Sequence, residues 1–131
     1  MSVEASKKDT FTATVARLQE AVTQQKPQGV IGTLIRDATI QRFEFTLETA
    51  WKYMRYLLLQ DGVLREDVAS PRKTIQTAFA NSLISDTDTW LEMLRHRNSL
   101  AHTYNEAEAC VLEENIKGRY LGLFEELLRH T

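Results

Sequence analysis

Helix breakers are scarce in this chain, and their scarcity limits the possible folds more than any other feature. Only two prolines and five glycines interrupt 131 residues, and apolar residues recur at intervals of three and four. This spacing places apolar side chains on one face of an α-helix, whereas a half-buried strand would need alternation. The pattern therefore predicts an all-α fold, an antiparallel up-and-down bundle of four main helices plus a short helix.

Local signals divide the chain into five helical segments. Ser70 is a helix cap with Pro71 at the first helical position, Asp86 or Asp88 caps a later helix, and Asn105 begins a turn. We expect helices at about 5–25, 32–60, 71–81, 86–104 and 106–129. No linker or low-complexity tract separates these segments, so residues 1–131 are expected to form a single helical-bundle domain.

Composition narrows the class of protein further. The formal net charge is −2, which argues against a constitutive, tight nucleic-acid binder, so any RNA contact must come from a local cluster of cations. A single cysteine, Cys110, excludes an internal disulfide and fits a reducing compartment. No apolar run approaches the ~20 residues of a membrane span, and the polar N-terminus lacks a signal-peptide core. We expect a soluble, cytoplasmic protein with no membrane contact.

One stretch carries most of the chemistry, the run Arg-Asn-Ser-Leu-Ala-His-Thr-Tyr that begins at Arg97 and ends at Tyr104. The Arg97 guanidinium stays protonated and matches phosphate oxygens with two parallel hydrogen bonds. His102 can give or take a proton near neutrality. A base for an attacking hydroxyl and a cation for the crowded phosphate are what cleavage of a phosphodiester without metal requires.

The spacing within this stretch leaves its structure open. Five helical steps separate Arg97 from His102 by about 140° around a regular helix, so the two side chains do not converge within one chain. Asn98 lies one turn before His102 on the same face. Either the helix distorts at the motif, or a twofold partner supplies the complementary residues at a dimer cleft. Spacing alone favours a structural histidine over a catalytic one.

The order Arg-x4-His-x-Tyr resembles the signature of the HEPN superfamily. More narrowly, the chain is similar to the nucleotidyltransferase substrate-binding proteins, which are paired with minimal nucleotidyltransferases. The resemblance covers roughly residues 30–128 and one departure is visible, Ala101, where close relatives carry a small hydroxyl residue. Besides the motif, it rests on four ordered segments, Gln41–Thr46 continuing into Ala50–Lys52, Ser70–Arg72 and Trp90–Leu94.

The resemblance implies a homodimeric cleft and leaves two functions open. In the first, the protein is a metal-independent endoribonuclease, the toxin of a toxin–antitoxin pair. His102 would then move the proton and Arg97 would bind the phosphate. Asn98 would orient His102 or the phosphate. In the second, it is a non-catalytic substrate-binding subunit of a two-chain nucleotidyltransferase. The resemblance also implies that the nucleotidyltransferase, encoded nearby, adds adenylyl groups to Tyr104.

Other polar patterns have simpler interpretations. A polar stripe of Gln41, Glu44, Glu48 and Lys52 is favoured as a solvated face, with an ordinary ion pair between the last two, over a functional groove. Glu92 and His96 have the i,i+4 spacing of a metal pair but lack a third ligand in the sequence nearby. There is also no glycine-rich phosphate loop. We therefore expect no metal and no bound cofactor.

Overall fold

The computed structural model describes residues 3–100 and 105–131. Within them it contains helices and no strand, which confirms the predicted all-α class. The elements, in chain order, are α1 (Val3–Val22), α2 (Val30–Gln60), the 3₁₀ turn η1 (Arg65–Val68), α3 (Pro71–Ala80), α4 (Thr87–Leu100), α5 (Glu106–Asn115), the π-helical turn η2 (Ile116–Tyr120) and α6 (Leu121–Arg129).

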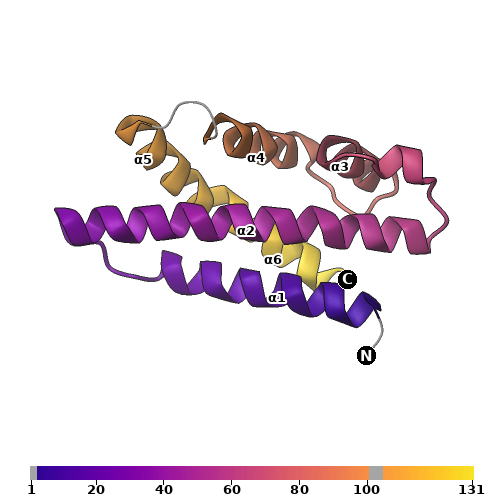
Figure 1. Ribbon diagram of the computed structural model, residues 1–131, viewed down its shortest axis with the longest axis horizontal. Coiled ribbons are helices and arrows are strands. Elements are labelled where there is room, and N and C mark those ends of the chain that lie inside the picture. The colour runs from indigo at the N-terminus through magenta and orange to yellow at the C-terminus, as the bar shows by residue number, and fades with distance from the viewer. Residues whose placement is uncertain (1–2, 101–104) are drawn as a thin grey trace.

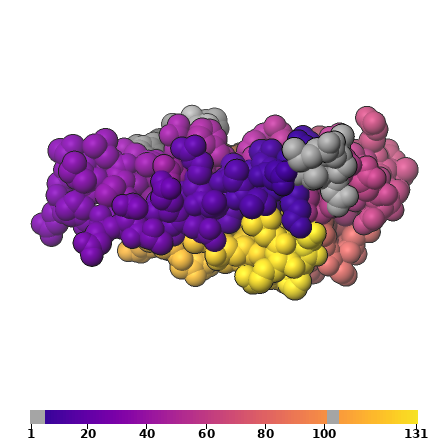
Figure 2. Space-filling view, turned by 90° about the horizontal axis from the view of Figure 1, so that it is seen from below, coloured from indigo at the N-terminus to yellow at the C-terminus, as the bar shows by residue number. Residues whose placement is uncertain are grey.

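The helices form an up-and-down bundle around α2, which runs the length of the molecule (Figure 1). α1 lies antiparallel to α2 on one side, and α3 and α4 lie on the other side. α5 and α6 pass behind α2 in this view and return the chain antiparallel to α4. Figure 2 shows the face formed by α1, with α6 packed along its edge.

An aromatic cluster joins these layers at the centre of the bundle. The ring of Phe124, on α6, lies 6.2 Å from those of Phe11 and Phe43 and 5.5 Å from that of Trp90, measured between centroids. Tyr120 stacks on Phe43 at 5.6 Å. These distances are typical of stabilising aromatic pairs, and all five side chains are buried. Residues from α1, α2, α4 and the C-terminal helices therefore share one core.

The connection between α1 and α2 depends on two glycines and one ion pair. Gly29 has φ +91°, a conformation that favours glycine, and a Cβ on Gly32 would lie 2.1 Å from the Pro27 carbonyl oxygen. Lys26 forms an ion pair with the buried Glu113 of α5. The close approach and the ion pair together hold this connection against the bundle.

The predicted caps are present. The Ser70 hydroxyl accepts a hydrogen bond from the Lys73 backbone N–H at 3.1 Å, and Pro71 follows as the first residue of α3. The sequence left the cap of the fourth helix open between two aspartates. Asp86 fills the position, because its Oδ1 accepts the Thr89 backbone N–H at 3.0 Å.

The single helix expected at 106–129 is wrong in one respect, because a π-helical turn divides it into α5 and α6. The physical reason is the spacing of the buried side chains Leu112, Ile116, Tyr120 and Phe124, which are four residues apart. A regular α-helix would rotate such a series by about 40° at each step, away from the core. A wider turn holds an extra residue and keeps all four facing inward.

One surface of α2 has no helix packed on it within the described residues. Val30, Ile31, Leu34 and Phe45 lie along it with exposed fractions of 74%, 57%, 57% and 56%. Ala38, also exposed, completes this stripe, which we call the open face of α2. The exposed Gln41 interrupts the stripe between Ala38 and Phe45, but a row of large exposed apolar side chains along one helix is still typical of an interaction surface. Among the described residues, no helix is both long and apolar enough to cross a bilayer.

Candidate functional site

The structure describes two of the four predicted site residues. Arg97 and Asn98 stand in the last turn of α4, and the Arg97 Nη2 donates to the Asn98 Oδ1 at 3.3 Å. Asn98 is exposed, whereas the Arg97 side chain is three-quarters buried against α2. His102 and Tyr104, like Ala101, lie outside the described residues, so the predicted approach of His102 to Arg97 stays a prediction.

A carboxylate of α2 holds the Arg97 side chain in place. The Arg97 Nη1 donates to the Glu48 Oε2 at 3.0 Å, an ion pair between helices whose paired residues lie 49 positions apart in sequence. Glu48 also forms the predicted i,i+4 ion pair with Lys52, at 3.2 Å through its other oxygen. Its partners therefore make Glu48 a junction between α2 and α4 as well as part of a solvated stripe.

Trp51 completes this junction. Its indole Nε1 donates to the same Glu48 oxygen that binds Arg97, at 3.0 Å. Burial alone would raise the pKa of Glu48, but hydrogen bonds from Trp51 and Lys52, with the charges of Lys52 and Arg97, hold that pKa below its ordinary value. Glu48 is therefore ionised at neutral pH and keeps Arg97 oriented.

Glu44, one turn before Glu48 on α2, has the opposite tendency. Burial raises the pKa of the Glu44 carboxyl, and the nearby charge of Arg97 counteracts part of this rise. Two carboxyl groups of different acidity thus lie near one guanidinium. A phosphate that reaches Arg97 must compete with the ionised Glu48.

A second polar cluster joins α4 to η2. The Tyr120 hydroxyl donates to the Glu92 Oε2 at 2.6 Å and lies 2.9 Å from the His96 Nδ1. Arg119 Nη1 binds the same Glu92 oxygen at 2.8 Å. Because the π turn carries Arg119 and Tyr120, the irregular turn and this cluster belong together.

The hydrogen bonds of the cluster determine its charges. The hydrogen bond from Tyr120, aided by Arg119, holds the pKa of Glu92 below its ordinary value. Burial and the neighbouring Glu92 raise the pKa of the Tyr120 hydroxyl well above its ordinary value, so the phenol stays protonated. Burial also lowers the pKa of His96, although Glu92 opposes that shift. At neutral pH the cluster therefore contains a carboxylate, a phenol and a neutral imidazole.

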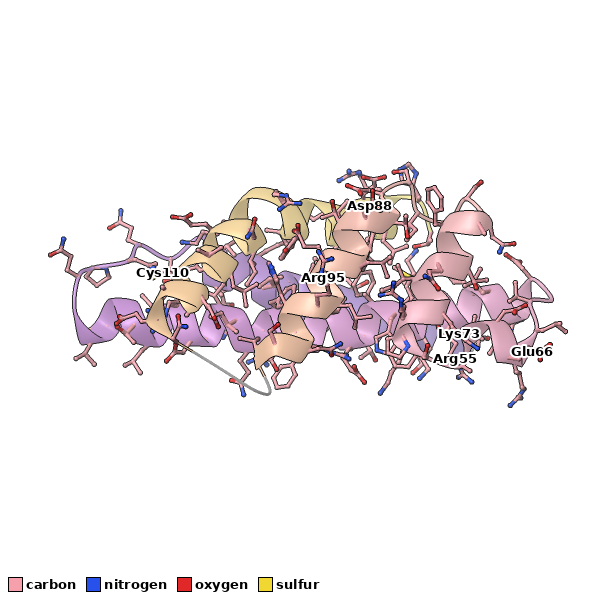
Figure 3. The ribbon with its side chains drawn as sticks, turned by 90° about the horizontal axis from the view of Figure 1, so that it is seen from above. Arg55, Glu66, Lys73, Asp88, Arg95 and Cys110 are labelled. Atoms are coloured by element: carbon pink, nitrogen blue, oxygen red, sulfur yellow. The ribbon has the colours of Figure 1, made fainter. Side chains whose placement is uncertain are left out.

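A cavity of about 370 Å³ opens between α4 and α5, beside the motif. Figures 1 and 3 show these helices side by side, with Arg95 marking α4 and Cys110 marking α5 in Figure 3. The residues that line it are His96, Ser99, Leu100, Ala107, Glu108, Val111 and Leu112. The cavity is mainly apolar, with a few polar groups at its edge, as small-molecule sites commonly are.

The described side chains offer binding chemistry rather than metal chemistry. They contain an oriented arginine for an anion and a neutral histidine at a cavity, and no group of three or more potential metal ligands was found among them. Arg97 can bind a phosphate oxygen through donors that Glu48 and Asn98 do not use, because a guanidinium has five N–H groups.

Comparison with known proteins identifies the family. A family model described as "Nucleotidyltransferase substrate binding protein like" matches residues 7–131. The chain belongs to this family. This is the HEPN-type family that the stretch from Arg97 to Tyr104 resembles. The matched region includes both described polar clusters.

Two relatives agree with this assignment. A Haemophilus influenzae protein (strain ATCC 51907 / DSM 11121 / KW20 / Rd) named "Probable ribonuclease HepT" is 32% identical over 93 residues, 70% of this chain. The match spans 63% of that relative, a little less than two thirds of its length. A crystal structure of a Thermus thermophilus protein matches with a TM-score of 0.76 and 32% identity, over 91% of this chain and 96% of that one.

The sequence missed two partners of the site. Glu48 was assigned only to a local pair with Lys52, because i,i+4 spacing reveals neighbours on one helix and nothing about α4. Tyr120 gives no polar signal in the sequence, because its ring belongs to the apolar core, where it stacks on Phe43. The signal that could have found its hydroxyl is the Glu92–His96 pair, since two half-buried polar groups one turn apart favour a third group that binds them both.

Proposed function

We propose that this protein is a metal-independent endoribonuclease of the HEPN type, controlled by a minimal nucleotidyltransferase in a toxin–antitoxin-like module. Arg97 binds and neutralises the scissile phosphate, and His102 transfers the proton at the attacking or leaving oxygen. Asn98 orients the phosphate or the histidine. The protein acts in the cytoplasm, where both RNA and the partner enzyme are found.

The observation that supports this function best is the fixed orientation of Arg97. Glu48 holds one terminal nitrogen at 3.0 Å and Asn98 holds the other at 3.3 Å. An arginine that is already oriented loses less conformational freedom when it binds a phosphate, and it stabilises charge that develops there without reorganising.

The name of the Haemophilus relative supports the same chemistry. Although that match spans only part of the relative, it covers 70% of this chain. We carry its activity over as a proposal, with Arg97 and His102 as the residues on which it depends.

A homodimer completes the site in this proposal. The open face of α2 leads along the helix from Val30 to Phe45 and continues to Glu48, which binds Arg97. A second copy that packs on this face brings two Arg97 side chains, and two motif stretches, to one cleft. The twofold arrangement would resolve the angle of about 140° between Arg97 and His102 on a regular helix.

Cleavage of purified RNA tests the function. The protein should cut RNA in the presence of EDTA, whereas Arg97→Ala and His102→Ala should each abolish cutting. Arg42→Ala, on the other side of α2 against α1, is the matched control and should cut normally. Circular dichroism should show the same helix content in all four proteins. Cutting that survives His102→Ala, or that disappears with EDTA, contradicts the mechanism.

A second function, a non-catalytic subunit of a two-chain nucleotidyltransferase, is favoured by the family's own description as substrate-binding. In that case the chain alone should leave RNA intact and growth unaffected. Its addition to the partner enzyme should then increase nucleotide transfer to a third molecule. The two functions therefore differ in what expression of this chain alone does to a cell.

Regulation acts through Tyr104 in this proposal. An adenylyl group on Tyr104 would place an anion two residues from His102, where it would occupy the position of the RNA phosphate. The partner enzyme with ATP and Mg²⁺ should add the mass of AMP less water, once or several times, to each chain. Intact mass spectrometry should find no addition to Tyr104→Phe, and equal addition to both proteins would refute this role.

A further inference from the structure

The cavity between α4 and α5 has a shape and a polarity that the proposed cleavage chemistry does not use. Its volume of about 370 Å³ falls within the range of about 300–1,000 Å³ that small-molecule sites occupy. Leu100, Leu112 and Val111 provide aliphatic walls from two facing helices. Val111 remains 55% exposed at the rim, so the cavity is accessible. A cavity with aliphatic walls on two sides suits a flat, weakly hydrated ring.

Among the described residues that line the cavity, two polar side chains, His96 and Glu108, offer hydrogen-bond acceptors. The Tyr120 hydroxyl has a single proton, which it donates to Glu92 at 2.6 Å. Its oxygen must therefore accept the proton of the His96 Nδ1, which lies 2.9 Å away. In a neutral imidazole the other nitrogen, Nε2, is then a bare acceptor on the opposite edge of the ring.

Glu108 adds a second acceptor to the same cavity. Its carboxylate is exposed, and only its backbone N–H, which donates to the Asn105 side chain at 2.8 Å, takes part in capping α5. Ser99 lines the cavity from α4 and can either donate or accept. A ligand that binds these two described groups therefore supplies donors to a carboxylate and an imidazole nitrogen, and the Glu108 charge disfavours an anion there.

We propose that this cavity binds a guanine base, with N1–H and one amino hydrogen donating to the Glu108 carboxylate, the second amino hydrogen donating to the His96 Nε2, and the ring between Leu100 and Val111. Guanine carries N1–H and an amino group side by side, which match the two oxygens of a carboxylate. Uracil offers one donor between two carbonyl oxygens, and hypoxanthine offers one donor beside a single carbonyl oxygen. Adenine and cytosine each offer an acceptor next to the amino group. The carboxylate therefore selects guanine among the common bases.

The inference deepens the proposed function and rests on it for the source of the base. The cavity lies beside the last turn of α4, where Arg97 stands, so a guanine held there would be a base of the RNA near the cut. A free guanosine nucleotide presents the same base. Binding of guanosine alone tests the cavity, and the bases beside the cleavage sites test the source.

Isothermal titration of the full chain with guanosine, inosine and adenosine is the first test. Guanosine should bind at least about tenfold more tightly than the other two, the discrimination expected from a bidentate base contact. Glu108→Gln should weaken guanosine by a similar factor and strengthen adenosine, since an amide matches the edge of adenine. Glu114→Gln, an exposed carboxylate on the same helix outside the cavity, should change neither.

A blocking variant provides a second measurement. Val111→Trp, at the exposed rim, should fill the slot and abolish guanosine binding, while Leu64→Trp, equally exposed but on the η1 side of the molecule, should not. If guanosine does not bind, or binds Glu108→Gln and Val111→Trp as it binds the natural protein, the inference is wrong.

Sequencing of RNA ends separates this inference from the proposed function. If the protein cuts RNA, guanine should predominate beside the cuts, and Glu108→Gln should shift that preference towards adenine. If RNA is cut with no base preference, the proposal that the bound guanine belongs to the RNA is wrong, even if guanosine binds. If guanosine binds but RNA is not cut, the assignment of the cavity stands and the proposed ribonuclease activity is wrong.

Discussion

Tyr120 connects the core to the polar cluster within one side chain. Its ring stacks on Phe43, and its hydroxyl binds both Glu92 and His96. Tyr120→Phe keeps the ring and leaves two half-buried polar groups without that partner. We expect a loss of about 1–3 kcal/mol in the free energy of unfolding, the usual cost of unsatisfied polar groups. Urea denaturation followed by circular dichroism measures it.

A matched control for that variant is Tyr56→Phe. The Tyr56 hydroxyl accepts a hydrogen bond from the exposed Gln60 side chain, one turn along α2. Its removal should change stability by less than about 0.5 kcal/mol, as exposed substitutions commonly do. Equal losses of stability in the two variants would show that the cluster of Tyr120, Glu92 and His96 contributes no more than an exposed hydrogen bond.

His96 predicts the direction of a pH dependence. Burial lowers the pKa of His96 in the folded protein, with Glu92 opposing the shift and Arg95 and Arg119 adding to it. The unfolded chain therefore binds a proton more readily. The contribution to stability is complete above the ordinary pKa of 6.5 and is lost as the pH falls from there through the folded value.

We therefore expect the free energy of unfolding to decrease between about pH 7.5 and pH 5.5 at constant salt. His96→Gln should reduce this slope, because glutamine does not titrate. If the slope persists in His96→Gln, other titratable groups cause it.

At the scale of elements, the π turn η2 makes a testable prediction about register. Deletion of Gly118, which is exposed, removes the extra residue and should turn η2 into a regular α-helix. Leu112 and Phe124 should both keep facing the core, because loss of the extra residue together with the wide turn leaves the rotation between them unchanged. We therefore expect the deletion to fold, with a free energy of unfolding within about 1 kcal/mol of the natural protein in thermal unfolding.

Gly122→Ala is the contrasting variant in α6. A Cβ at this position meets open space, so alanine fits without strain. It should raise the free energy of unfolding by about 0.5–1 kcal/mol, because glycine is the poorer helix former. A loss of several kcal/mol on deletion of Gly118 would contradict the register argument, whereas Gly122→Ala tests only helix propensity.

The elements also show which features of the fold could be read from the sequence. Ser70 and Asn105 act locally, so their patterns predict the starts of α3 and α5 correctly, and the sequence narrows the cap of α4 to Asp86 or Asp88, of which the structure shows Asp86. The π turn is also encoded, in the four-residue spacing around Ile116, but a search for regular helices overlooks it. The Glu48–Arg97 contact could not be predicted, because it depends on how α2 and α4 pack.

At the scale of the whole molecule, the open face of α2 predicts a dimer. Specific interfaces bury at least about 1,200 Å² in total, and a twofold contact along this face would remove its apolar stripe from water. Phe45→Glu should convert the dimer to a monomer without loss of helix, and Leu64→Glu should not. Analytical ultracentrifugation at micromolar concentration distinguishes the two. A natural protein that sediments as a monomer would exclude the shared cleft.

At the scale of the whole chain, only part of the structure could be predicted from the sequence alone. The class and the up-and-down order followed from helical spacing and few breakers, because those properties are local. That residues 1–131 form one domain, and that His102 and Tyr104 face a shared cleft, stay predictions. They depend on residues beyond the described part of the chain, or on a second copy.

The shared position of Glu48, between the open face of α2 and Arg97, has a thermodynamic consequence. If association of two chains changes how Glu48 holds Arg97, then assembly and anion binding are linked, and linkage is reciprocal. Whatever factor dimerisation adds to the affinity of Arg97 for a phosphate, a bound phosphate must add to the stability of the dimer. Dilution would then weaken RNA binding, and a short RNA would keep the two chains together at concentrations at which they otherwise separate.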